Sequence, residues 1–439
     1  MAEVRPFHGV RYNQQLIPDL AAVICPPYDI IAAGQQDELY KRSAYNFVRI
    51  EYNRELPQDD ARDNRYTRAA GYIAEWLEGG ILKMDALPGL YLHEHHFTCQ
   101  GKPYRRRNIL ACVRLEDWDK KVVRPHENII PKAKSDRLSM LYACQANTSP
   151  VLAMYEDSGE KITFLAADQE QRPPEVDFTD SSGDRQQMWA INEPQSIRQV
   201  QQVISEQPLY IADGHHRYDS ALTYQRERAA QAASVTGEEG FNYVMMSLVE
   251  FSDPGLIIMP PHRLVRGISR PVLSGLKSQL KAFFDIEELS LSAPDVWQKV
   301  DASLTGMGSE MQQVRLAVVG LEAGKLLLLS LRDGNMANRL MPAFHSDLYK
   351  KLDVSLVDHI ILEKLLAFDK DREEMTLAYS HDRLDAVNRV RDQQYQLVFI
   401  LNPVKPELIK AIADTGDRMP RKSTYFYPKS PAGLVFYRW

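Results

Sequence analysis

The chain has 439 residues, of which 44% are hydrophobic and 26% are charged, and its formal net charge is −6. This composition is typical of globular proteins and excludes collagen-like, coiled-coil and disordered classes, while the length indicates two or three domains. The negative charge argues against binding to DNA by bulk electrostatics, so we expect no nucleic-acid partner.

Targeting signals and cysteine motifs limit the classes further. The chain begins with MAEVRPFHGVRYN, which lacks the apolar core of a signal peptide. No run of about 18 apolar residues predicts a membrane span. The four cysteines form no C-x-x-C pair, so neither a zinc ribbon nor a redox motif is indicated. We therefore expect a cytoplasmic protein with reduced thiols and no membrane partner.

The first half of the chain predicts a long β-hairpin accompanied by helices. Apolar and polar residues alternate over 90–98 and 105–115, on either side of a turn at Gly101, as in two paired strands. The polar segment 168–184 contains two prolines and is expected to be a surface excursion. Periodicity and cap residues also predict a helix over 63–77, a helix within 131–147 and a strand over 149–155.

From residue 187 onward, predicted strands and helices alternate, which favours mixed α/β layers. We expect a main domain over 1–268, a smaller α/β subdomain over 269–350, and a C-terminal segment over 351–439 that returns to the main domain. The predicted strands are 187–191, 208–212, 241–251, 256–259, 286–289, 314–319, 325–331, 376–379 and 395–401. The predicted helices are 194–206, 215–232, 272–284, 294–304, 353–366, 382–391 and 407–415.

The sharpest motif is a short apolar strand that turns at Asp213 and Gly214 directly into a helix. Gly214 allows a tight turn, and the free N–H groups and dipole of the helix that follows form an anion site. His215, His216 and Arg217 add side-chain donors, and the guanidinium can hold a phosphate or a carboxylate with two hydrogen bonds. Asp213 can carry Mg²⁺ or accept a hydroxyl proton. The alternative is a capped helix with structural or solvated histidines.

A second polar cluster is Arg-Pro-His-Glu at 124–127. Glu127 can act as a base or a metal ligand, and His126 as a proton carrier. Lys134 and Arg137 flank the start of the next predicted helix and form a second candidate anion cradle. The alternative for both is a solvated polar loop.

The C-terminal segment 418–429 mixes cations, including Arg418 and Lys422, with aromatic residues. Such a mixture can stack bases and bind phosphates. Because the chain is acidic overall, a single nucleotide or small anion is favoured over a nucleic acid. The alternative is a closing strand whose aromatic residues pack into the core.

The run His-Glu-His-His at 93–96 is a candidate metal site. On a strand, His93 and His95 face the same way and lie close enough to share an ion. The sequence offers no evident third ligand, so we expect a structural or exposed strand. The P-loop, the glycine-rich dinucleotide motif, the zinc-protease motif and the nucleophile elbow are all absent from the sequence.

Several of these motifs resemble those of one protein family and occur in the same order along the chain. The stretch ADGHHRYDSAL resembles the signature of the bacterial and archaeal domain-of-unknown-function 1015 family. The name of that family assigns no activity. Further segments that resemble it are Arg-Pro-Phe at 5–7, Pro-Pro-Tyr-Asp at 26–29, Arg-Pro-His-Glu at 124–127, Lys-Ser-Asp-Arg-Leu at 134–138, Asn-Thr-Ser-Pro at 147–150 and the tail at 416–429.

The Asp-Gly-His-His-Arg turn at 213–217 is also similar to the phosphate-contacting loop of the ParB/sulfiredoxin-like superfamily, whose free serine kinases carry a similar Asp-Gly-His-His-Arg. This resemblance implies a mixed α/β fold with a ParB/sulfiredoxin-like nucleotide-binding core and a smaller α/β sandwich region. It further implies that residues 213–217 contact nucleotide phosphate and its metal, with ATP or ADP and Mg²⁺ as cofactors. The resemblance assigns no residue of this chain to the catalytic glutamate of those kinases.

These observations lead to the hypothesis of a nucleotide-dependent phosphotransferase or phosphohydrolase that acts on a small hydroxylated metabolite, with serine implied by the resemblance. A ParB-like nucleotide-dependent switch without turnover is the alternative, and an anion-binding module is a third. The sequence leaves the oligomeric state open. The candidate catalytic residues are His126, Glu127 and Asp213, and the candidate phosphate-neutralising residues are Lys134, Arg137, Arg418 and Lys422.

Overall fold

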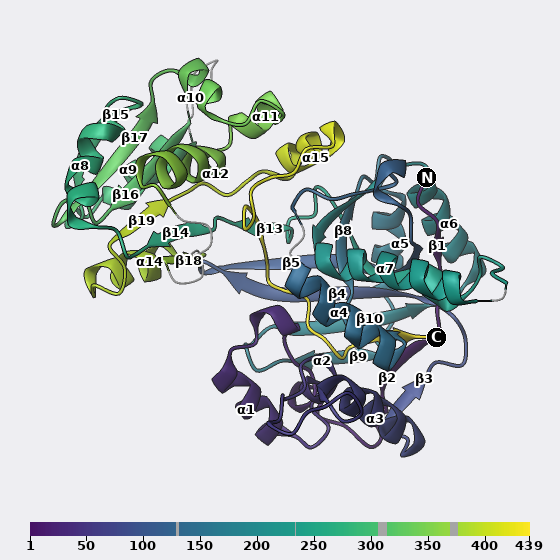
Figure 1. The fold of residues 1–439 in the computed structure, drawn as a ribbon. Helices are drawn as coiled ribbons and strands as arrows, with labels where there is room; N and C mark the ends of the chain where they lie inside the picture. The colour runs from purple at the N-terminus through teal and green to yellow at the C-terminus, as the bar shows by residue number, and fades with distance from the viewer. Residues whose placement is uncertain (129–130, 233, 306–313, 369–375) are drawn as a thin grey trace. The chain divides into compact units, whose positions relative to one another are not determined.

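A computed structural model describes residues 1–128, 131–232, 234–305, 314–368 and 376–439 (Figure 1). Contacts divide the chain into two units. Unit 1 comprises Met1–Pro125, Ile129–Ile257 and Phe426–Trp439, and unit 2 comprises His126–Asn128 and Ile258–Tyr425. The three domain ranges expected from the sequence stay a prediction.

Unit 1 is built on a mixed sheet in the order β6-β11-β8-β12-β5-β4-β10-β9, with β1 paired to β5. The predicted hairpin is confirmed as β4 and β5, which pair from Tyr91 opposite Leu110 to Cys99 opposite Lys102. β8 runs parallel to β12, and β6 runs parallel to β11. The strands are β1 (Val4–Arg5), β4 (Leu90–Cys99), β5 (Lys102–Arg114), β6 (Val123–Arg124), β8 (Val151–Tyr155), β9 (Val176–Thr179), β10 (Arg185–Ile191), β11 (Leu209–Asp213) and β12 (Tyr243–Glu250).

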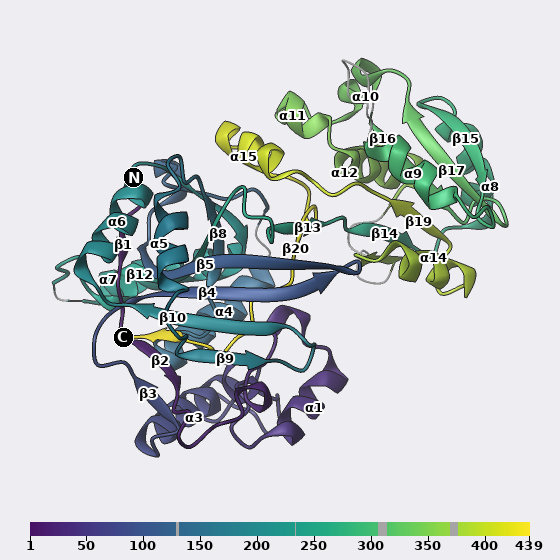
Figure 2. The same ribbon diagram turned by 180° about the vertical axis from the view of Figure 1, so that it is seen from behind.

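Figures 1 and 2 show helices on both sides of this sheet, and a separate apolar cluster lies on each of its two faces. The face with Tyr91 and Met245 packs against α1, α2, α3 and a small sheet in the order β3-β2-β21-β7. The face with Ile109 and Leu248 packs against α5, α6 and α7. These elements are α1 (Ala33–Arg42), α2 (Val48–Glu51), α3 (Arg65–Glu78), α5 (Lys161–Gln169), α6 (Pro194–Ser205), α7 (His215–Gln231), β2 (Gly9–Tyr12), β3 (Leu82–Met84), β7 (Ala146–Asn147) and β21 (Phe436–Arg438).

Local signals explain where several helices begin. Asn64 caps α3 through its side chain, which accepts from the backbone N–H of Thr67, while the Thr67 hydroxyl accepts from the N–H of Asn64. Pro194 opens α6, where a missing N–H costs nothing. The helix predicted within 131–147 is α4 (Pro131–Cys144), which contributes Leu141 to one apolar cluster and Met140 to the other.

Unit 2 is built on an antiparallel sheet in the order β15-β17-β16-β19-β14-β18. One face packs against α9 and α14 through Val300 and Val387. The single helix predicted over 353–366 is instead α12 followed by a π-helix, Val357–Leu365. The elements are β14 (His262–Val265), β15 (Phe284–Ser290), β16 (Arg315–Val319), β17 (Lys325–Leu331), β18 (Leu377–Ser380), β19 (Leu397–Ile400), α8 (Arg270–Leu280), α9 (Val296–Thr305), α10 (Gly334–Leu340), α11 (Asp347–Lys350), α12 (Asp353–Leu356), α14 (Arg383–Arg391) and α15 (Pro406–Thr415).

The chain changes unit on either side of His126–Asn128, within β13 (Ile257–Met259) and within β20 (Tyr425–Tyr427), and β13 pairs with β20. The predicted mixed α/β class is confirmed. The segment 168–184, predicted as a surface excursion, is mostly exposed and contains β9, which pairs with β10 at the edge of the sheet. All four cysteines are buried and free. In the part of the chain that the structure describes, no helix has the length and apolar character to cross a bilayer.

Candidate functional site

The turn between β11 and α7 contains residues 213–217, which we call the corner. A bulge between Ile211 and Asp213 interrupts the pairing of β11 with β8 and changes the direction of the Asp213 side chain. Gly214 has a φ of +93°, a left-handed conformation that disfavours other residues. α7 then begins at His215, which is buried, and His216 is half-buried. The strand, the turn and the helix predicted here are therefore confirmed.

Three charged side chains meet at the corner. The Asp213 carboxylate accepts a hydrogen bond from Lys429 Nζ at Oδ1 and one from Arg217 Nη2 at Oδ2, at 2.5 Å in the latter case. Arg217 Nη1 also donates to the Pro150 carbonyl. Exposed fractions are 19% for the Asp213 side chain, 11% for Arg217 and 9% for Lys429, so the group is largely buried but reaches solvent.

The charges fix the protonation state of the carboxylate. Burial raises the pKa of Asp213, but the positive charges of Lys429 and Arg217 outweigh burial and hold that pKa well below its ordinary value. Asp213 is therefore ionised at neutral pH and is a weak base in this arrangement. The Mg²⁺ site predicted at Asp213 does not fit these surroundings, because both carboxylate oxygens already bind cations.

The Arg217 side chain folds back over its own turn. A Cβ atom at position 214 would lie 2.8 Å from Arg217 Nε, so any other residue there would displace this side chain in addition to adopting a disfavoured backbone conformation. Arg217 Nε itself is buried and has no hydrogen-bond partner. One donor of this guanidinium is thus left for an acceptor that the protein does not supply.

A buried carboxylate, Glu51 at the end of α2, organises the residues beside the corner. Its oxygens accept hydrogen bonds from Thr148 Oγ1 at 2.6 Å and Ser149 Oγ at 2.9 Å, and Arg137 Nη1 lies 3.8 Å from Oε1. A cavity of about 30 Å³ is lined by these three residues and Arg217, among others. It has room for ordered water beside the corner.

Arg106 on β5 is a functional candidate that the sequence does not reveal. It is fully buried, and among the described residues it forms no ion pair. Its Nη1 and Nη2 atoms reach the Tyr427 carbonyl and Ser430 Oγ only at 3.5 Å each, and its Nε has no partner. Burial lowers the pKa of Arg106 to about 10. A buried guanidinium without a counterion is costly, and the segment it contacts also carries Lys429.

The remaining candidates fall into two groups. In unit 1, Lys134 Nζ forms an ion pair with Asp219 Oδ2 at 2.7 Å. In unit 2, Glu127 Oε1 accepts from the backbone N–H of Thr424 at 3.3 Å and from its hydroxyl at 3.2 Å. The Thr424 hydroxyl also lies 3.0 Å from His126 Nε2.

Arg418 and Lys422 belong to the same unit 2 group as His126 and Glu127. Arg418 Nη1 donates to the Glu127 carbonyl at 3.2 Å, and Lys422 is exposed with a φ of +56°. The structure therefore brings His126, Glu127 and Arg418 together, and separately brings residues 213–217 together with Arg137.

Comparisons with known proteins give one family and several distant structures. A family model described as "Protein of unknown function (DUF1015)" matches residues 4–355. No curated protein matches the chain.

Three solved structures are similar to 74% of this chain. A conserved hypothetical protein from Pyrococcus furiosus is 13% identical, with 95% of its chain covered and a TM-score of 0.34. A mutant of free serine kinase in complex with ADP is 12% identical, with 91% covered and a TM-score of 0.35. SbnI with a C-terminal truncation from Staphylococcus aureus is 11% identical, with 85% covered and a TM-score of 0.36.

Proposed function

The chain belongs to the DUF1015 family, whose description names no activity, and we propose its function from the corner. The corner binds the phosphate groups of ADP or ATP, and the protein transfers a phosphoryl group from the nucleotide to a small hydroxylated metabolite. Serine is the first acceptor to test.

The observation that carries this proposal is an excess of buried cationic donors in unit 1. Arg217 and Lys429 both bind the carboxylate of Asp213, and Lys429 Nζ also lies 4.0 Å from the exposed Asp29 carboxylate. Arg106 has no carboxylate partner among the described residues. The Nε atoms of both arginines are buried without an acceptor. A phosphate group offers several charged oxygens and satisfies such donors with short, charge-assisted hydrogen bonds. The glycine that precedes α7 has no side chain to cap it, so the first backbone N–H groups of this helix are further donors for a phosphate group.

On nucleotide binding, a phosphate group would replace the Asp213 carboxylate as the anion that Lys429 and Arg217 contact. The phosphate takes Lys429 and Arg217 from Asp213, and the removal of these charges lets the pKa of Asp213 rise, since they are what lowers it. The released carboxylate can then accept the proton of the acceptor hydroxyl. The hydroxyl oxygen bonds to the terminal phosphorus, the bond from that phosphorus to the nucleotide oxygen breaks, and Lys429 and Arg217 neutralise the charge on the transferred group.

Replacing Arg217 with alanine should weaken nucleotide binding by about 1.5–3 kcal/mol, or roughly 10- to 150-fold, because charge-assisted hydrogen bonds to phosphate are lost. Isothermal titration calorimetry with ADP and with ATP measures this change. The matched control is Arg226→Ala, on the same helix but exposed and paired with Asp117, which should bind as the wild type does. A folded Arg217→Ala protein with unchanged affinity would exclude the corner as the phosphate site.

Transfer is tested separately from binding. The protein is incubated with ATP or ADP and serine, and ³¹P NMR detects phosphorylated product. We expect product with the wild type and none with Lys429→Met, which keeps the length of the side chain but removes its charge. Nucleotide binding without any phosphorylated product from serine or other hydroxylated metabolites would refute the transfer step.

A further inference from the structure

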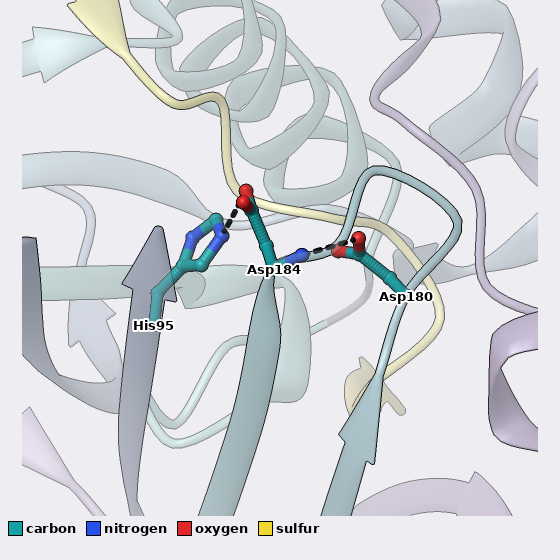
Figure 3. A group of neighbouring side chains, drawn as sticks. All are labelled: His95, Asp180 and Asp184. Carbon is teal, nitrogen blue, oxygen red and sulfur yellow. Dashed lines mark hydrogen bonds and ion pairs between the residues drawn. The ribbon is translucent and has the colours of Figure 1, made fainter. Parts of the chain in front are cut away.

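Three metal-ligating side chains of unit 1 meet where the β9–β10 hairpin turns beside β4 (Figure 3). His95 lies on β4, and Asp180 and Asp184 lie at the two ends of the turn that joins β9 to β10. One ligand atom from each residue lies within 4.8 Å of the other two. His95 Nε2 is 3.0 Å from Asp184 Oδ2, and Asp180 Oδ1 accepts the backbone N–H of Asp184 at 3.2 Å.

The imidazole of His95 is directed at these carboxylates from inside the protein. His95 is 2% exposed, and its second ring nitrogen, Nδ1, is buried with no hydrogen-bond partner. A neutral imidazole nitrogen is the commonest protein ligand for metal ions.

The two carboxylates lack a cation. Within the ranges that the structure describes, no lysine or arginine forms an ion pair with Asp180 or Asp184. Arg185, the next residue in the chain, pairs with Asp177 instead, at 2.6 Å. Arg106, which lies opposite His95 in the β4–β5 register, reaches only the 427–430 segment. A dication would add positive charge beside two carboxylates that, among the described residues, form no ion pair with a lysine or an arginine.

We infer that His95, Asp180 and Asp184 bind a divalent first-row transition-metal ion, such as Zn²⁺ or Mn²⁺. One imidazole nitrogen and two carboxylate oxygens suit these ions, whereas Mg²⁺ and Ca²⁺ prefer oxygen ligands alone. Asp180 Oδ1 also accepts the N–H of Ser182 at 2.9 Å, and Oδ2 accepts from Gln186 Nε2 at 3.0 Å, so this carboxylate is held in place at the turn. Small rotations would bring the three ligand atoms to about 2.0–2.2 Å from a common centre. The ion would hold the hairpin turn against β4.

Metal titration of the full-length, metal-free protein tests this inference. Calorimetry with ZnCl₂ should show one site in the wild type, and Asp184→Asn should weaken it at least about tenfold because a charged ligand becomes a neutral amide. The matched control is Asp177→Asn on the same hairpin, outside the cluster, which should bind Zn²⁺ as the wild type does. Equal Zn²⁺ affinity of the wild type and Asp184→Asn would overturn the inference.

Spectroscopy supplies a readout that does not depend on the affinity alone. With Mn²⁺, the electron paramagnetic resonance signal of free ion should fall on addition of the wild type or Asp177→Asn, and should persist with His95→Gln or Asp184→Asn. Circular dichroism identifies variants that remain folded, and only these enter the comparison. Absence of Zn²⁺ and Mn²⁺ binding by the wild type would also refute the site. Nucleotide binding at the corner is measured independently, so the two proposals fail separately.

Discussion

Replacing Glu51 with alanine should lower the free energy of unfolding by about 3–5 kcal/mol. Glu51 is fully buried, and it is the acceptor for the hydroxyls of Thr148 and Ser149. Alanine would leave these buried hydroxyls without their acceptor and would remove one of the two carboxylates beside Arg137, which keeps its ion pair with Asp136. Urea unfolding followed by circular dichroism, with the wild type in parallel, measures the loss.

Two further variants serve as comparisons for Glu51→Ala: one removes the charge of Glu51 but keeps its size, and the other removes an exposed glutamate nearby. Glu51→Gln keeps one carbonyl acceptor and should lose less stability than Glu51→Ala. Glu55 is exposed and pairs with Arg65 at the surface, so Glu55→Ala should change the free energy of unfolding by no more than about 0.5 kcal/mol. If Glu51→Ala unfolds like Glu55→Ala, the carboxylate does not hold the residues beside the corner.

The same substitution bears on the proposed function. Thr148 and Ser149 precede Pro150, whose carbonyl accepts from Arg217. Loss of Glu51 therefore removes the support of the segment that positions the guanidinium. We expect folded Glu51→Ala protein to bind nucleotide more weakly than Glu55→Ala protein.

The sequence predicts what local signals determine. The alternation in β4 and β5 and the apolar run before Asp213 specify strands, and Gly214 specifies the turn into α7. These preferences depend on only a few neighbouring residues, so the same local structures are found in the folded chain. The segment 168–184 shows the limit of such signals, because β9 is held by its pairing with β10 and not by its own pattern.

The partners of the candidate site could not be predicted because they come from distant parts of the chain. Lys429 lies 216 residues from Asp213 in the sequence. The C-terminal segment that contains Lys429 also carries aromatic residues, which are typical of a closing strand. Arg106 lies between two other arginines on a strand, and its burial depends on what covers that face. The sequence alone does not reveal Asp184 as a possible metal ligand beside His95. The two residues are 89 positions apart, and the pairing of β10 with β4 brings them together.

Acidification should destabilise the protein through His262 in unit 2. His262 is 3% exposed, and its Nδ1 accepts the backbone N–H of Leu401 at 3.1 Å, which requires that nitrogen to be unprotonated. Burial, followed by the charges of His381 and Arg383, lowers the pKa of His262 from 6.5 to about 3. The unfolded chain therefore binds a proton before the folded chain does. The stability from this group is complete above pH 6.5 and is lost as the pH falls toward 3.

The expected size of the effect follows from the two pKa values. At about pH 5, protonation of the unfolded chain alone removes about 2 kcal/mol of stability. Asp353, in the same unit, acts in the opposite direction, since burial raises its pKa to about 6 and the folded chain then binds the proton first. Comparison with His262→Gln removes this opposing contribution, because Asp353 is present in both proteins. Urea unfolding at about pH 7.5 and pH 5 should show that the wild type loses about 2 kcal/mol more than the variant. Equal losses in the two proteins would mean that His262 titrates alike in the folded and unfolded chains.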